Sequence, residues 1–123
     1  MSEPKILEFE RQNKRETGIE SKTNEFVDGK QVYVKRFQIE SLPNNGSYPF
    51  DSGLDFREIN IIRLEGVARY KSTGAVIPMN FSNPIATNEQ IGLRCTQTGT
   101  ITIYTGVDRS DYEGFVDMYY TKK

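Results

Sequence analysis

Residues 59–70 read INIIRLEGVARY, and this stretch decides the fold class. Side chains at alternate positions differ in polarity. The residues at even positions are mostly apolar, Ile62, Leu64, Gly66, Ala68 and Tyr70, and charged residues lie between them, Arg63, Glu65 and Arg69. Successive side chains of a β-strand point to opposite faces, so the alternation predicts a strand with one buried face and one solvated face.

Similar short runs, rich in β-branched and aromatic residues and separated by turn residues, lie on both sides of this strand. We expect further strands over residues 31–40, 48–50, 76–81, 91–95, 101–105 and 115–121. Lys35 interrupts the first of these runs, which is typical of a bulged or edge strand. Pro49 and Pro78 cannot donate to a ladder, so their runs are expected at sheet edges. No helical stripe separates any two strands, which favours an all-β fold, an antiparallel β-sandwich of jelly-roll-like topology.

The N-terminal part of the chain has a different composition from the rest. Residues 1–29 are rich in charges of both signs and poor in large apolar groups, so we expect an extended tail there and one domain over residues 30–123. Ile6, Leu7 and Phe9 are too few for a coiled-coil seam. We interpret them as a short docking segment that orders on a partner, with a solvated terminus as the alternative.

The charge and the rare residues restrict the functions that are open to this chain. Its 16 basic and 17 acidic side chains give a net charge of −1, so neither nucleic acid nor an anionic membrane is an expected partner. No apolar run is long enough for a membrane helix or a signal peptide, and we expect a protein made in the cytoplasm. With no histidine and only Cys95, the chain cannot form a histidine or thiolate zinc site, a Ser-His-Asp triad or a Cys-His pair. We therefore expect no enzyme, no cofactor and no metal.

Two acidic groups and several tyrosines are the remaining site candidates. The acidic groups are Asp51, Asp55 and Glu58, and then Asp108, Asp111, Glu113 and Asp117. Either group could hold a carboxylate pair or a calcium ion, but loop aspartates more often bond the nearby backbone. Tyr48, Tyr104, Tyr112 and Tyr119 are candidate contacts for a sugar or for a subunit interface. Cys95 shares a strand face with apolar residues and is interpreted as a small buried hydrophobe.

An ordered series of short motifs runs through the predicted domain. Glu25 to Tyr33 reads EFVDGKQVY, Leu42 to Asn45 reads LPNN, Gly106 to Ser110 reads GVDRS, and Gly114 to Lys122 reads GFVDMYYTK. Together they resemble a β-sandwich module of bacteriophage tail-fibre, baseplate and other virion structural proteins, over roughly residues 24–122. Phe26 stands where that family usually has tryptophan, and Ser52-Gly53-Leu54 replaces a characteristic His-Gly-Ile.

The resemblance implies a non-enzymatic virion structural protein that assembles as a homotrimer. With only a short segment ahead of the module, we expect an accessory such as a head fibre, a decoration protein or a tail-tip or baseplate subunit, bound to other virion proteins through its tail. Arg109 is then a candidate for pairing across a subunit boundary. The alternative is a host-surface glycan-binding adsorption module. A glycan hydrolase that uses Asp51, Asp55 or Asp108 has the weakest support.

Overall fold

The computed structural model of the chain describes residues 18–79, 90–96 and 98–123. These residues form an all-β structure, as the sequence predicts. The strands are β1 (Glu20–Val27), β2 (Lys30–Ile39), β3 (Ser47–Asp51), β4 (Ile59–Tyr70), β5 (Val76–Pro78), β6 (Ile91–Cys95), β7 (Thr100–Thr105) and β8 (Tyr112–Lys122). In the described ranges there is no helix that has the length and apolarity to cross a membrane.

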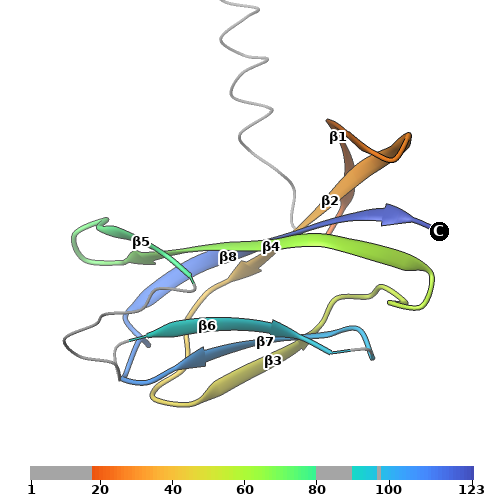
Figure 1. Cartoon of the computed structure of the whole chain (residues 1–123). Helices are drawn as coiled ribbons and strands as arrows, with labels where there is room; N and C mark the ends of the chain where they lie inside the picture. Colours follow the sequence, from red (N-terminus) through yellow and green to blue (C-terminus); the bar gives the residue numbers. More distant parts are fainter. Residues whose placement is uncertain (1–17, 80–89, 97) are drawn as a thin grey trace, which may run out of the picture.

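The strands form two antiparallel sheets that pack face to face as a sandwich (Figure 1). The larger sheet has the order β1-β2-β8-β4-β5, and the smaller sheet has the order β3-β7-β6. β2 pairs with β8 in one sheet while β3, the next strand along the chain, pairs with β7 in the other. The pair β2–β8 of the larger sheet is therefore continued by the pair β3–β7 of the smaller sheet. This passage of one strand pair from one sheet to the other is the jelly-roll-like topology that the sequence predicts.

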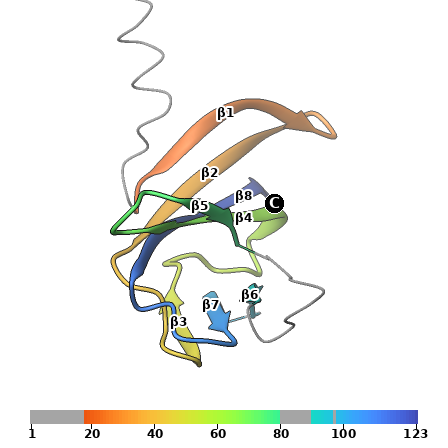
Figure 2. The same ribbon diagram turned by 90° about the vertical axis from the view of Figure 1, so that its left-hand side faces the viewer.

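The main core lies between the two sheets. β2 and β8 contribute Phe37, Ile39, Val116, Met118 and Tyr120 from alternate positions. The smaller sheet, which forms the lower layer in Figure 2, contributes Ile91, Ile101 and Ile103. β3 and β5, the strands that contain Pro49 and Pro78, both lie at sheet edges as expected.

Because β4 contains a bulge, the predicted face of Ile62 is wrong. Ile61 is opposite Tyr120 and Arg63 is opposite Tyr119, so Ile62 is the extra residue. Ile61 packs against the main core, whereas Ile62 packs on the other side of the larger sheet. From Leu64 to Tyr70 the predicted faces are confirmed.

The outer face of the larger sheet carries a second, smaller core. Val32, Val34 and Tyr119 are buried there, with Ile62 beside them. The guanidinium carbon of Arg63 lies 3.8 Å from the centre of the Tyr119 ring, and Arg63 also bridges to Glu25 of β1 with an N–O distance of 2.6 Å. Because β2 and β8 separate β1 from β4 in the sheet, this ion pair spans the outer face and covers the apolar residues beneath it.

Two expectations about the N-terminal part of the sheet are wrong. Residues 20–27 are not part of a tail but form β1, which pairs along β2. Of the two alternatives for residues 31–40, a bulged or an edge strand, the edge position is also wrong, since β2 lies between β1 and β8, while its pairing with β1 is irregular. Lys35 is accommodated on its inward side because the Nζ atom donates a hydrogen bond of 2.8 Å to the carbonyl oxygen of Ser52.

The predicted docking residues Ile6, Leu7 and Phe9 lie outside the described residues.

Candidate functional site

Two motifs that are far apart in the sequence meet at one end of the sandwich. The amide of Asn45 donates to the carbonyl of Val107 at 3.1 Å, and the amide of Arg109 donates to the carbonyl of Pro43 at 3.1 Å. An isolated antiparallel bridge joins Asn44 to Asp108. The segments 42–45 and 106–110 therefore form one corner, which we call the motif corner, where the chain crosses between the sheets.

The side chains of the motif corner mainly support its backbone. Leu42 is buried in the main core. Asp108 accepts hydrogen bonds from the amide of Ser110 at 2.9 Å and from its hydroxyl at 2.6 Å, and these bonds lower the pKa of the Asp108 carboxyl. The guanidinium of Arg109 lies 5.0 Å from the ring centre of Tyr112, which in turn packs on Tyr70. Arg109 and Tyr112 are thus brought together here, in contact with the framework of the corner.

The other candidate tyrosines are separated from one another. Tyr48 and Tyr104 are about two-fifths exposed, but Tyr48 is paired opposite the inward-facing Ile103, whereas Tyr104 is paired opposite Gly92 on the outer side of the smaller sheet. Tyr119 is buried, with 6% of its surface exposed, because the Arg63 guanidinium covers it. The expectation that Tyr119 is a surface contact is therefore wrong for the described chain. These four tyrosines do not form one binding surface.

Aspartates of the two acidic groups bind donors of the chain itself. Oδ1 of Asp51 accepts from the amide of Gly53 at 2.9 Å. Both carboxylate oxygens of Asp55 bind the Arg57 guanidinium, and this interaction lowers the pKa of the Asp55 carboxyl. Asp117 is buried and forms a bidentate ion pair with Arg36, with distances of 2.8 and 2.9 Å. Within the described ranges no group of three or more acidic or cysteine side chains is arranged to hold a metal ion.

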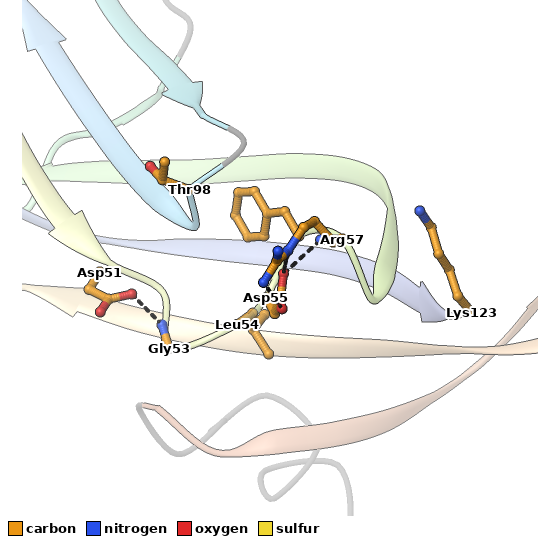
Figure 3. Close-up of a pocket in the computed structure, with 8 residues that line it drawn as sticks. Asp51, Gly53, Leu54, Asp55, Arg57, Thr98 and Lys123 are labelled. Carbon is orange, nitrogen blue, oxygen red and sulfur yellow. Dashed lines mark hydrogen bonds and ion pairs between the residues drawn. The ribbon is translucent and has the colours of Figure 1, made fainter.

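A surface groove lies at the opposite end of β3 and β7 from the motif corner. It is an open hollow of about 960 Å³, lined by Asp51, Gly53, Leu54, Asp55, Phe56, Arg57, Thr98 and Lys123. A neighbouring hollow of about 750 Å³ shares Gly53, Leu54, Asp55, Arg57 and Lys123 with it and continues toward Glu20 and Lys122. We call these two hollows together the end groove. In Figure 3, Asp51 and Lys123 lie on opposite sides of the Asp55–Arg57 pair.

The wall of the end groove is held by backbone hydrogen bonds. The amide of Ser52 donates to the carbonyl of Gly99 at 2.9 Å, which ties the wall to the turn between β6 and β7. The amide of Glu58 donates to the carbonyl of Asp55 at 2.9 Å, and the amide of Lys123 donates to the carbonyl of Glu58 at 3.0 Å. The groove is therefore preformed by the fold, which is usual for sites that bind small ligands.

A polar cluster closes the far part of the end groove. The hydroxyl of Tyr120 donates to Glu20, and Nζ of Lys122 lies 2.9 Å from the same carboxylate. Burial acts to raise the pKa of the Glu20 carboxyl, but the hydrogen bonds from Tyr120 and Lys122 outweigh it, so the pKa lies below its ordinary value of 4.5. Burial and the bond to Glu20 raise the pKa of Tyr120.

The first hairpin carries exposed apolar side chains. Asp28 and Gly29 form its turn with φ values of 51° and 76°, and Phe26 beside the turn is 65% exposed. Figure 2 shows this hairpin projecting beyond the rest of the sandwich. The pairing of β1 with β2 is irregular between Lys22 and Phe26, where Nε2 of Gln31 donates to the carbonyl of Thr23 at 2.6 Å. Such a bulge limits direct pairing of further strands along this edge.

Only part of the end groove is predicted from the sequence. Asp51, Asp55 and Glu58 form one loop group in the sequence, and these residues do line the groove. Phe56, Arg57 and Lys123 are not predicted, because their only signal is their nearness to that loop or to the last strand. Cys95 is a free thiol that is only partly buried, packed against the main core.

Comparison of the chain with models of protein families, with curated protein sequences and with solved structures finds no match.

Proposed function

We propose that this chain is a non-enzymatic structural subunit of a bacteriophage particle, a head-fibre, decoration or tail-tip or baseplate accessory that works as a homotrimer. The observation that carries the proposal is the motif corner. Two of the motifs on which the resemblance rests, residues 42–45 and 106–110, bond directly to each other across more than sixty residues of sequence. This contact supports the proposal that the motifs are the framework of one module.

The contacts of the acidic side chains also favour a structural role. Asp51, Asp55 and Asp108 accept hydrogen bonds from the chain around them, and Asp117 is paired with Arg36. A carboxylate in such a bond stabilises a turn or a strand pair. This role supports a scaffold better than it supports a general acid or base.

The location is tested by mass spectrometry of phage particles purified from the source of this gene. We expect the protein as a stoichiometric component that stays with the particles through a density gradient. A chain that is absent from the particles but abundant in the lysate contradicts the proposal.

The docking role of the N-terminal segment is tested by replacing Ile6, Leu7 and Phe9 together with serine. We expect the variant to keep the circular dichroism spectrum and melting temperature of the native protein but to be lost from purified particles. The matched control replaces the exposed Val76 with serine and is incorporated normally. Normal incorporation of the triple variant removes the docking role.

The trimer is tested by light scattering coupled to size-exclusion chromatography of the full chain. We expect a mass of about three times the 14.1 kDa of one chain. A monomer across the micromolar range contradicts the homotrimer and leaves the particle test to decide the location.

A further inference from the structure

We propose that the end groove binds an extended, uncharged saccharide chain. This inference stands apart from the proposed virion role, since a saccharide can bind here whatever assembly the chain belongs to. It also moves the expected glycan contacts away from the dispersed tyrosines and onto the loop between β3 and β4. Three properties of the groove carry it: the chemistry of its lining, its charge and its rigidity.

The lining offers apolar surface beside hydrogen-bonding groups of both kinds. Phe56 and Leu54 supply the apolar part. Asp51 uses Oδ1 for the Gly53 amide, and among the described residues its Oδ2 atom has no partner. Nζ of Lys123 likewise has no partner within the described ranges, and it lies on the far side of the Asp55–Arg57 pair (Figure 3). A sugar presents an apolar C–H face together with hydroxyls that both donate and accept, so it matches this combination.

The charge of the groove favours an uncharged ligand. The acidic lining residues are Glu20, Asp51, Asp55 and Glu58, and the basic lining residues are Arg57, Lys122 and Lys123. The near balance gives no attraction for a polyanion such as a nucleic acid, which needs clustered basic residues. Several of these charges are already paired inside the groove, as in Asp55–Arg57 and Glu20–Lys122.

The rigidity of the groove lowers the cost of binding. Ser52 is buried. Its amide donates a hydrogen bond to the carbonyl of Gly99, and its carbonyl accepts one from Nζ of Lys35. The loop is thus fixed to the smaller sheet and to β2 before any ligand arrives. A preformed site does not lose loop entropy on binding, which matters for the weak contacts that saccharides make.

The first experiment screens the full chain on an array of oligosaccharides, with maltohexaose, cellohexaose and chitohexaose as uncharged probes and heparin hexasaccharide as the charged probe. We expect signal on at least one uncharged glycan, and the strongest probe is then titrated by calorimetry. No signal on any uncharged glycan, or signal on heparin alone, overturns the proposal.

The second experiment uses matched arginine variants to test whether the saccharide binds in the end groove. Arg57 and Arg69 are both exposed and each is paired with a carboxylate, but Arg69 lies at the end of β4 that is remote from the groove. We expect Arg57→Ala to weaken binding about tenfold and Arg69→Ala to leave it unchanged, since a charged hydrogen bond contributes roughly that factor. Equal affinities of Arg57→Ala and the native protein, together with an unchanged Lys123→Ala, overturn the assignment to this groove.

A third variant tests the apolar contact separately. Phe56 packs partly against the core, so Phe56→Ala would endanger folding, whereas Phe56→Leu keeps most of the apolar volume and removes the ring face. We expect Phe56→Leu to weaken binding about three- to tenfold at an unchanged melting temperature. Full affinity in this variant removes the stacking contact from the proposal.

Discussion

The ion pair between Arg36 and Asp117 is the interaction whose removal should damage the fold most clearly. Asp117 lies on β8 in the middle of the larger sheet, and the side chains of Arg36 and Asp117 are only 15% and 5% exposed. The Arg36 guanidinium also stacks on Phe115, with its central carbon 3.7 Å from the ring centre. The hydrogen bonds to Asp117 raise the pKa of Arg36. The guanidinium keeps its charge even without them, because an arginine side chain is not deprotonated in proteins.

The cost of Asp117→Ala follows from this burial. Removing one member of a buried pair leaves an uncompensated charge, which costs about 3–5 kcal/mol. We expect the lower part of that range, about 3 kcal/mol, because Arg36 retains some contact with solvent. For a chain of 123 residues this corresponds to a fall of about 12 °C in melting temperature. The double replacement Arg36→Met with Asp117→Val should restore stability to within about 1 kcal/mol, since apolar groups of similar size replace buried ion pairs well.

The assay is urea unfolding of the native protein, Asp117→Ala, the single variants Arg36→Met and Asp117→Val, and the double variant, all at one protein concentration so that any assembly is compared at equal concentration. Far-ultraviolet circular dichroism follows the sheets and tyrosine fluorescence follows the core, since the chain has no tryptophan. Each single variant leaves one buried charge without its partner and should cost about 3 kcal/mol, so with a double variant within about 1 kcal/mol of the native protein the coupling free energy of the cycle should be about 5 kcal/mol in magnitude. A cost below about 1 kcal/mol for Asp117→Ala, or a double variant as unstable as the sum of the singles, would refute the reasoning.

Three further predictions concern backbone packing, the bulge in β1 and acid. Gly114→Ala should cost at least about 3 kcal/mol in urea unfolding because a Cβ there overlaps the carbonyl oxygen of Val67, whereas Gly92→Ala should cost far less, its nearest neighbour being 3.9 Å away. Gln31→Ala should cost about 1 kcal/mol and speed amide exchange in β1, and the exposed Gln38→Ala on the same strand should do neither. Hydrogen bonds and ion pairs lower the pKa of four carboxyl groups, so these groups keep their charge to lower pH in the folded chain than in the unfolded chain. The urea midpoint should therefore be flat from about pH 5.5 to 8, as no histidine titrates there, and fall below about pH 4.5; a midpoint that rises on acidification would contradict this.

Alternation predicts a strand best where one of its faces is buried. β4 is such a strand, and its bounds agree with the prediction. β8 was predicted from its apolar and aromatic residues, although both of its faces are buried over residues 116–121. β1 was missed because its sequence, ESKTNEFV, is mostly polar: its side chains are exposed or only partly buried, so no alternation of apolar and polar residues marks the strand. Its only signal is the Asp28-Gly29 turn, which fixes the hairpin and hence the strand before it.

Adjacent apolar residues are where alternation fails to assign a face. Ile61 and Ile62 point to different sides, as neighbours in a strand do, and the bulge then places Ile62 and Arg63 on the same outer face. Nothing in the local sequence indicates where that shift occurs. Tyr119 and Tyr120 raise the same difficulty. Both are buried, but Tyr120 lies in the main core and Tyr119 lies under Arg63 on the outer face. When a charged side chain covers an aromatic ring, a face that would otherwise be solvated becomes a small buried core. The pattern of hydrophobic residues does not predict this, because the covering residue is charged.

The motif corner and the end groove lie at opposite ends of β3 and β7, and this separation has a consequence for how the chain can change. Substitutions in the corner act on the crossing between the sheets, where Pro43 accepts bonds from both Arg109 and Thr105. Substitutions of Arg57 or Lys123 act on exposed side chains whose loss leaves the backbone bonds of the groove wall in place. Ligand preference at the groove can therefore change while the framework that would support assembly stays the same. Variants in the motif corner should therefore lower the free energy of unfolding, whereas variants in the end groove should lower the affinity for the saccharide.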